Sequence, residues 1–305
     1  MKILIVGIGG VGGYFGGLLA KHKSNENKIY FMARGEHLEQ IKTSGLTIVS
    51  QDQKWIVYPD IASDNPEDFG LVDYAIICTK SYDLKETAQK IKSCIKDGTV
   101  IIPLLNGLDN STLLRNLFPN ALVADGCAFT ISRLVSPGKI EVKGNSHKII
   151  YGIQGTVDVR LNYLSELFHK AGIVCKLTEE INIQVWQKFI FIAAIATITS
   201  YYLLSFGEIK ANQTYISEFA DLINECISLA LKMGILLEPD FSDIVWNRFL
   251  LLQPQSTSSM CADFMARREK TEIDSLSGFV VKKAQEYKLE VPQFKRMYEG
   301  ILGRY

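Results

Sequence analysis

The chain has 305 residues, of which 47% are hydrophobic and 22% charged, and it contains 33 Lys+Arg and 33 Asp+Glu residues. This length favours two domains, and the balanced charge gives no general attraction for nucleic acid or an anionic membrane. Six cysteines without a C-x-x-C pair and only four histidines argue against a zinc site or a disulfide scaffold, so we expect no metal and a reduced, cytoplasmic protein.

The first predicted elements are a strand and a helix joined by a glycine-rich turn. Lys2–Val6 is a β-branched apolar run typical of a buried central strand. The turn that follows fits G-x-G-x-x-G and opens a segment with apolar residues at helical spacing. A purely structural tight turn is the alternative. We favour a dinucleotide site, because a helix N-terminus attracts phosphate and glycines let the backbone approach it. The residues expected to contact the cofactor here are Gly7, Gly9, Gly10, Val11 and Gly12.

The end of the second predicted strand, Lys28–Met32, indicates which dinucleotide is bound. An NAD enzyme places an acid about 20 residues past the glycines to hold the ribose 2′-hydroxyl. Here Ala33 is followed by Arg34, whose planar guanidinium suits a 2′-phosphate, and the nearby acid Glu36 lies beyond it. The pattern therefore favours NADP(H), that is NADPH/NADP+, over NAD(H). A solvated loop charge is the alternative for Arg34.

The rest of the first half alternates strands and helices, which is typical of an α/β, doubly wound parallel sheet. Helices are predicted over Glu36–Thr43, Leu84–Ile95, Ser111–Phe118 and Val159–Lys170. Strands are predicted over Leu46–Val49 and Trp55–Tyr58 (as a hairpin), Asp73–Cys78, Thr99–Leu104, Ala121–Ala124, Lys139–Val142, Lys148–Tyr151 and Ile173–Lys176. We assign residues 1–177 to a Rossmann-type domain. Arg34, Lys80 and Asn106 follow strand ends, where such sheets bind ligands, so we expect them in one crevice.

From Glu179 onward long helical patterns replace the strands. They run over Ile181–Leu204, Tyr215–Met233, Asp240–Leu252 and Glu272–Tyr287. We predict an all-helical substrate or dimerisation domain over 178–305, with the active site in the cleft between the domains.

Two further expectations concern membranes and assembly. The apolar stretch Phe189–Leu204 is sixteen residues long, shorter than the roughly 20 that a membrane span needs, so a buried core helix is expected. Because Gly7 interrupts the apolar run after Lys2, we expect no signal peptide. Exposed apolar positions at Phe249, Leu251 and Leu252 could serve a homodimer, and helix packing explains them equally well.

Several polar residues could carry chemistry, each with a plainer alternative. Lys80 could reach a phosphate, a ribose or a substrate, or be a surface lysine. Asn106 could bond the nicotinamide or the reacting carbonyl, or form a turn with Gly107. Lys188 begins the most apolar helix, where lost solvation lowers a lysine pKa and suits a general acid. A snorkelling side chain is the alternative for Lys188.

The last candidates are Ser258, Ser259 and Glu272. The serines could cap a helix and the acid could favour a helix start. In a cleft facing Lys188, the same groups could bind a substrate carboxylate and pair with the lysine.

The chain resembles the ketopantoate reductase (2-dehydropantoate 2-reductase) family over essentially its whole length. The matching stretches are GIGGVGGYFG, ARGEHLEQIKTSGL, CTKSYDL, PLLNGLDN, SPGKIEVKG, VWQKF and SSMCADFMARREKTEID. The resemblance implies a Rossmann domain, a helical domain and NADPH-dependent reduction of a 2-oxo acid. Ketopantoate, reduced to (R)-pantoate for pantothenate and coenzyme A, is the leading substrate, and the hydride comes from the cofactor.

The resemblance also implies roles by position. The glycines hold the pyrophosphate and Arg34 the 2′-phosphate, while Lys80 and Asn106 line the nicotinamide end. Asn106 and Lys188 contact the substrate, and Lys188 donates the proton. Glu272 supports the site and contacts the cofactor. Ser259 contacts the substrate; Ser258 is the alternative, because the stretch to Glu272 is one residue longer than the family pattern.

One departure concerns the substrate. The family pattern has an asparagine one helical turn after the lysine and often a second one turn later, where this chain has Ile192 and Ala196. Isoleucine cannot hydrogen-bond, and a lost contact costs on the order of 1–3 kcal/mol. A more apolar 2-oxo acid is therefore an alternative substrate. A non-catalytic NADP(H)-binding regulator is a further alternative, although it would need neither Lys188 nor Glu272.

Overall fold

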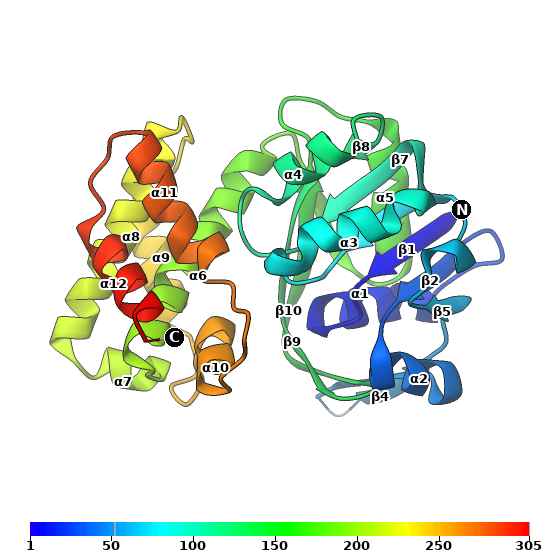
Figure 1. The fold of residues 1–305 in the computed structure, drawn as a ribbon, viewed down its shortest axis with the longest axis horizontal. Helices are drawn as coiled ribbons and strands as arrows, with labels where there is room; N and C mark the ends of the chain where they lie inside the picture. Colours follow the sequence, from blue (N-terminus) through cyan, green and yellow to red (C-terminus); the bar gives the residue numbers. More distant parts are fainter. Residues whose placement is uncertain (52, 305) are drawn as a thin grey trace. The chain divides into compact units, whose positions relative to one another are not determined.

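The strand Lys2–Val6 (β1) lies inside a six-stranded sheet in the computed structural model, which describes residues 1–51 and 53–304 (Figure 1). The strand order is β5-β2-β1-β6-β7-β8, and every pairing is parallel. The other strands are β2 (Lys28–Met32), β5 (Ile61–Ser63), β6 (Val72–Ile77), β7 (Ile95–Pro103) and β8 (Leu122–Val123). The predicted parallel sheet is thus confirmed. Because β2 and β6 flank β1 on opposite sides, the strand order reverses at β1, the point where such sheets bind ligands.

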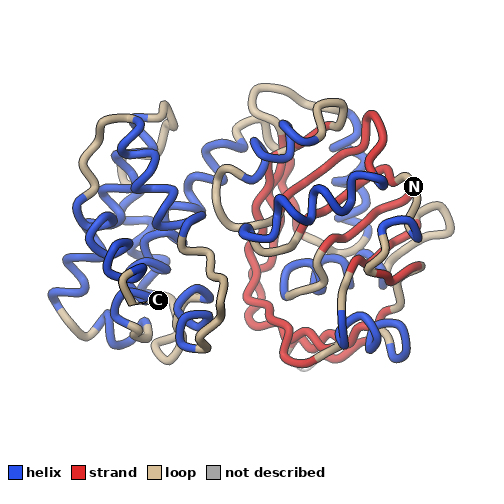
Figure 2. Tube along the Cα trace, in the orientation of Figure 1, coloured by secondary structure: helices blue, strands red, loops and turns tan. Residues whose placement is uncertain are grey.

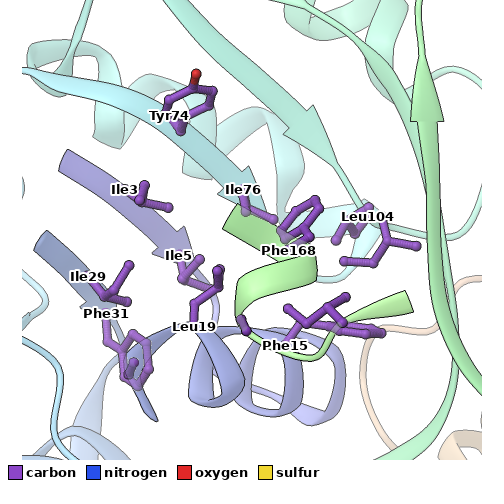
Figure 3. Close-up of a cluster of buried hydrophobic side chains, with 14 of the residues drawn as sticks. Ile3, Ile5, Phe15, Leu19, Ile29, Phe31, Tyr74, Ile76, Leu104 and Phe168 are labelled. Carbon is purple, nitrogen blue, oxygen red and sulfur yellow. The ribbon is translucent and has the colours of Figure 1, made fainter. Parts of the chain in front are cut away.

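Among the described residues of this half, five α-helices accompany the strands. They are α1 (Gly10–Lys21), α2 (Gly35–Ser44), α3 (Leu84–Lys90), α4 (Asn110–Leu117) and α5 (Val159–Lys170). The predicted helix over 84–95 ends early and continues as a 3₁₀ turn, Ile91–Cys94 (η3). Figure 3 shows Ile5 of β1 gathered with Phe15 and Leu19 of α1 in one buried cluster. Burying such a side chain contributes about 1.5–3 kcal/mol, so this cluster fixes α1 on the sheet.

A second sheet was not predicted. Its five strands are β3 (Leu46–Ser50), β4 (Gln53–Val57), β9 (Asp125–Ser136), β10 (Lys139–Gly152) and β11 (Val174–Leu177). The segments predicted over 139–142 and 148–151 are one strand with a register shift between Lys143 and Lys148. Strand β9 was not predicted because its second half is exposed: Ile131 is 65% exposed and Leu134 is 43% exposed. The apolar and polar residues there do not alternate, so the usual sign of a half-buried strand is missing.

The chain divides into two compact units. Unit 1 comprises Met1–Leu105 and Asp109–Ile181, and unit 2 comprises Asn106–Leu108 and the chain from Asn182 onward. We predicted a boundary after residue 177, which is slightly earlier than the division between Ile181 and Asn182. Tyr305, the last residue of the predicted second domain, lies outside the described residues.

Helices make up the described elements of unit 2 (Figure 2). They are α6 (Ile181–Tyr202), α7 (Phe206–Lys210), α8 (Gln213–Lys232), α9 (Phe241–Leu250), α10 (Ser259–Met265), α11 (Phe279–Glu286) and α12 (Pro292–Leu302). The helix predicted over 272–287 begins later than expected: Asp274–Gly278 forms a π-helical turn (η4), and the α-helix α11 follows from Phe279. Helices α7 and α12 were not predicted.

Helix α6 is the core helix of unit 2. It is long and apolar enough to cross a membrane, but most of its side chains are buried among the other helices of this unit. Its Phe189 packs edge-to-face on Phe279 of α11, with ring centroids 5.2 Å apart. The prediction that Phe249 is exposed was wrong: this residue is 0% exposed and packs on Phe219. Leu251 is 85% exposed.

Candidate functional site

The glycines of the β1–α1 turn differ in what surrounds them. Gly7 has φ +90°, a left-handed conformation that favours glycine. A Cβ atom on Gly12 would lie 2.1 Å from the Gly7 carbonyl oxygen, and one on Gly10 would lie 2.2 Å from the carbonyl oxygen of Ser132. A Cβ atom on Gly9 would meet nothing within 4 Å. The turn therefore packs tightly on both sides and leaves open space at Gly9, in front of the α1 N-terminus.

His37, which the sequence analysis did not single out, supports this turn. Its Nε2 atom donates to the carbonyl oxygen of Ile8 at 2.7 Å, while its Nδ1 atom accepts from the Gly138 N–H at 2.8 Å. The imidazole is therefore neutral. Burial lowers the pKa of His37, and the bond to Ile8 opposes that shift. The signal was present, because His37 lies within the stretch ARGEHL that carried the family resemblance.

The turn suits a dinucleotide pyrophosphate. The open space at Gly9 borders the N-terminus of α1, whose first N–H groups have no helical partner and favour an anion. Thr79 lies against Gly7 and the Ser132 backbone against Gly10, and the hydroxyl of each is buried without a hydrogen-bond partner among the described residues.

Arg34 and Asp83 face each other beside the same turn. Arg34 follows β2, and its side chain is 83% exposed, with Nη2 3.6 Å from Oδ2 of Asp83. Asp83 is the last residue of a 3₁₀ turn, Ser81–Asp83 (η2), which follows β6. Lys80 is the N-cap residue of that turn, and it is half-buried. Exposed ion pairs contribute little stability, so the guanidinium can still bind an anion. No sequence pattern predicted Asp83 as its neighbour.

Unit 2 brings two predicted site residues into contact. Lys188 on α6 donates from Nζ to the amide oxygen Oδ1 of Asn106 at 3.1 Å. Ile192, one turn further along α6, is half-buried, whereas Ala196 is 4% exposed and belongs to the core of this unit. Packing therefore accounts for Ala196, and Ile192 is the departure from the family pattern that can affect a ligand.

Glu272 is 3% exposed and begins the segment that leads into the π-helical turn. Its carbonyl oxygen accepts from the Leu276 N–H at 3.1 Å. Ser277 in the turn shares a 2.7 Å hydrogen bond with Thr197 of α6. Single π-turns occur often at functional sites, and this buried bond ties the Glu272 segment to the helix that carries Lys188. Neither Thr197 nor Ser277 was predicted, because hydroxyl pairs between distant segments leave no sequence pattern.

The structure separates the two candidate serines. Ser258 is the N-cap of α10: its Oγ accepts from the Cys261 N–H at 3.1 Å and shares a 2.7 Å hydrogen bond with Thr199 of α6. Ser259 is exposed. The structure therefore gives Ser258 a capping role and leaves the Ser259 side chain accessible to a ligand.

We expect Ser258→Ala to lower the free energy of unfolding by about 1–2 kcal/mol, because it removes a helix cap and a buried hydrogen bond. Ser259→Ala should stay within about 0.5 kcal/mol of the wild type, as exposed substitutions usually do. Urea unfolding of both variants checks this pair, and equal destabilisation would contradict the assignment of the cap to Ser258.

Metal binding has no evident site in the part of the chain that the structure describes. Residues 1–51 and 53–304 contain no group of three or more His, Cys, Asp or Glu side chains placed to hold a metal ion.

Comparison with known proteins identifies the family. The chain matches the family model described as "Ketopantoate reductase PanE/ApbA" over residues 3–154, and the one described as "Ketopantoate reductase PanE/ApbA C terminal" over residues 180–303. The chain belongs to the ketopantoate reductase family. The resemblance stated from the sequence is thus confirmed, as is the combination of a parallel-sheet N-terminal part with a helical C-terminal part.

Relatives of this ketopantoate reductase family member cover nearly the whole chain. An uncharacterized oxidoreductase, YkpB, from Bacillus subtilis is 31% identical over 302 residues, which is 99% of this chain and 98% of the relative. The crystal structure of 2-dehydropantoate 2-reductase from Porphyromonas gingivalis W83 has 28% identity and a TM-score of 0.86, covering 99% of each chain. D-mandelate dehydrogenase, solved with NADH and anilino(oxo)acetate, shares the fold at 22% identity and a TM-score of 0.89, covering 100% of this chain and 98% of that one.

Proposed function

We propose that this protein is a cytoplasmic, NADPH-dependent reductase that converts 2-dehydropantoate (ketopantoate) to (R)-pantoate in pantothenate and coenzyme A biosynthesis. Membership of an oxidoreductase family supports the reaction class. The observation that carries the proposal is the 3.1 Å hydrogen bond from Lys188 to Asn106. It joins the expected proton donor to the side chain expected at the reacting carbonyl, although the two residues are far apart in sequence.

In the proposed reaction Lys188 is the general acid. Its ammonium group donates a proton to the substrate carbonyl oxygen as that oxygen gains negative charge. A positioned acid of this kind contributes about 10²–10⁴-fold to the rate. The bond from Nζ to Oδ1 of Asn106 fixes the lysine, and the amide nitrogen of the same side chain is a donor suited to a carbonyl oxygen. When bound, NADPH supplies the hydride.

The residues of unit 1 fit the binding of that cofactor. The β1–α1 turn offers open space at Gly9 and backbone N–H groups for the pyrophosphate. Arg34 presents an exposed guanidinium, whose fork matches a phosphate group, at the end of β2. The remaining roles are those that the family resemblance implies. Lys80 lines the nicotinamide end, Glu272 supports the site and contacts the cofactor, and Ser259 contacts the substrate.

A second candidate substrate is a more apolar 2-oxo acid. Ile192 lies one turn after Lys188, is half-buried, and offers methyl groups where a polar side chain would bind a substrate hydroxyl. A site that leaves a substrate hydroxyl without a partner discriminates against it. This observation favours a 2-oxo acid with an unsubstituted alkyl group.

The test is to follow NADPH oxidation by the purified protein with ketopantoate, 2-oxoisovalerate and oxaloacetate. Ketopantoate and 2-oxoisovalerate form a matched pair, because they differ by one hydroxymethyl group. We expect the highest kcat/KM with ketopantoate. A higher value with 2-oxoisovalerate would establish the apolar candidate, and NADPH binding without turnover of any 2-oxo acid would favour a regulator.

A further inference from the structure

The recognition site for the cofactor ribose carries an acid as well as a base. Arg34 follows β2 and Asp83 ends the turn after β6, and these strands flank β1 on opposite sides. The two side chains approach across the carboxyl edge of the sheet, with Nη2 of Arg34 3.6 Å from Oδ2 of Asp83. The Arg34 side chain is 83% exposed and the Asp83 side chain 20% exposed. The acid is therefore partly enclosed, and the base points into solvent beside it.

The two side chains favour different cofactors. A phosphate monoester carries nearly two negative charges at neutral pH, so a 2′-phosphate is attracted by Arg34 and repelled by Asp83. A carboxylate accepts hydrogen bonds and donates none. It is therefore a poor neighbour for a phosphate but a good acceptor for a ribose 2′-hydroxyl, which is the role that an acid plays in NAD enzymes.

We propose that Asp83 is a cofactor-discriminating residue that narrows the preference of this site for NADPH over NADH. It holds the Arg34 guanidinium by charge pairing, and a 2′-phosphate has to displace that pairing. With NADH, the carboxylate accepts the 2′-hydroxyl instead. Arg34 and Asp83 together let the protein use both dinucleotides, with NADPH moderately preferred. This inference rests on the dinucleotide site of the proposed function.

The test is equilibrium binding of NADPH and NADH to the full chain by isothermal titration calorimetry, without substrate. The variant Asp83→Asn keeps the size of the side chain and removes its charge. Exposed charge pairs are weak, so we expect about threefold to fivefold tighter NADPH binding and about threefold weaker NADH binding. The affinity ratio then shifts about tenfold toward NADPH.

A matched control separates a local effect from a general change of charge. Glu86→Gln removes the same charge from an exposed residue on α3, three positions after Asp83, and should leave the ratio unchanged. The fragments 2′,5′-ADP and 5′-AMP provide a second readout, because they differ only at the ribose 2′ position. They should show the same shift as the intact dinucleotides.

Each outcome decides the inference. An NADPH-to-NADH affinity ratio that is equal in the wild type and in Asp83→Asn, with both dinucleotides still bound, would overturn the role of Asp83 and leave the proposed function standing. An equal shift in Glu86→Gln would overturn it as well. If the wild type bound neither dinucleotide, the proposed function would fail and this inference with it.

Discussion

Replacing Lys188 by alanine is expected to lower kcat by about 10²–10⁴-fold, the contribution of a positioned general acid. The affinity for NADPH should change little, because the glycine turn and Arg34 are untouched. The loss is expected in kcat rather than in KM alone, since the proton is transferred as the carbonyl oxygen gains charge in the transition state.

The measurement is steady-state turnover with the best 2-oxo acid, together with NADPH binding by calorimetry. Lys295→Ala removes an exposed lysine from α12 of the same unit and serves as the control. It should match the wild type in both assays. Turnover by Lys188→Ala close to that of the wild type would exclude Lys188 as the proton donor.

The second large effect is expected at the glycine turn, where one substitution should lower stability and another should lower NADPH affinity. Gly12→Ala would place a Cβ atom 2.1 Å from the Gly7 carbonyl oxygen, so α1 would have to move away from β1. Such overpacking costs about 1–3 kcal/mol or more. We expect a clear loss of the free energy of unfolding, measured by urea denaturation without nucleotide.

Gly9→Ala should instead spare the fold and impair binding. Gly9 has φ −81°, which alanine adopts readily, and its Cβ atom would meet nothing within 4 Å. The loss of a glycine N-cap should cost no more than about 1 kcal/mol. The new methyl group would occupy the space proposed for the pyrophosphate, so NADPH affinity should fall about tenfold or more. Unchanged NADPH affinity in a folded Gly9→Ala protein would contradict the assignment of the turn.

Buried parallel strands were the part of the fold that could be predicted best. β1 and β2 begin and end where the apolar runs do, because such strands are covered on both faces and need no alternation. Strand β9 has an exposed second half and gave no such signal. Phe249 was misassigned, although Phe241, Val245 and Phe249 lie on one buried face of α9 at helical spacing.

The sequence could predict which residues belong to the candidate site, but not which of them contact each other. Lys188 and Asn106 were candidates from their sequence positions and from the resemblance, whereas their 3.1 Å hydrogen bond joins segments 82 positions apart and depends on the tertiary fold. Other contacts between distant segments were missed for the same reason. Asp83 beside Arg34 and Ser277 beside Thr197 are ordinary surface or helix residues until the fold places them together.

The grouping of Asn106–Leu108 with unit 2 has a consequence for protein engineering. These three residues follow a strand of unit 1, yet they cluster with the helices, and Leu108 packs on the helical core. A chimera that joins the N-terminal part of one family member to the helices of another at a single crossover near residue 181 would separate Asn106 from Lys188, its hydrogen-bond partner in this chain. Recombination of these enzymes should therefore transplant the 106–108 tripeptide together with the helical part.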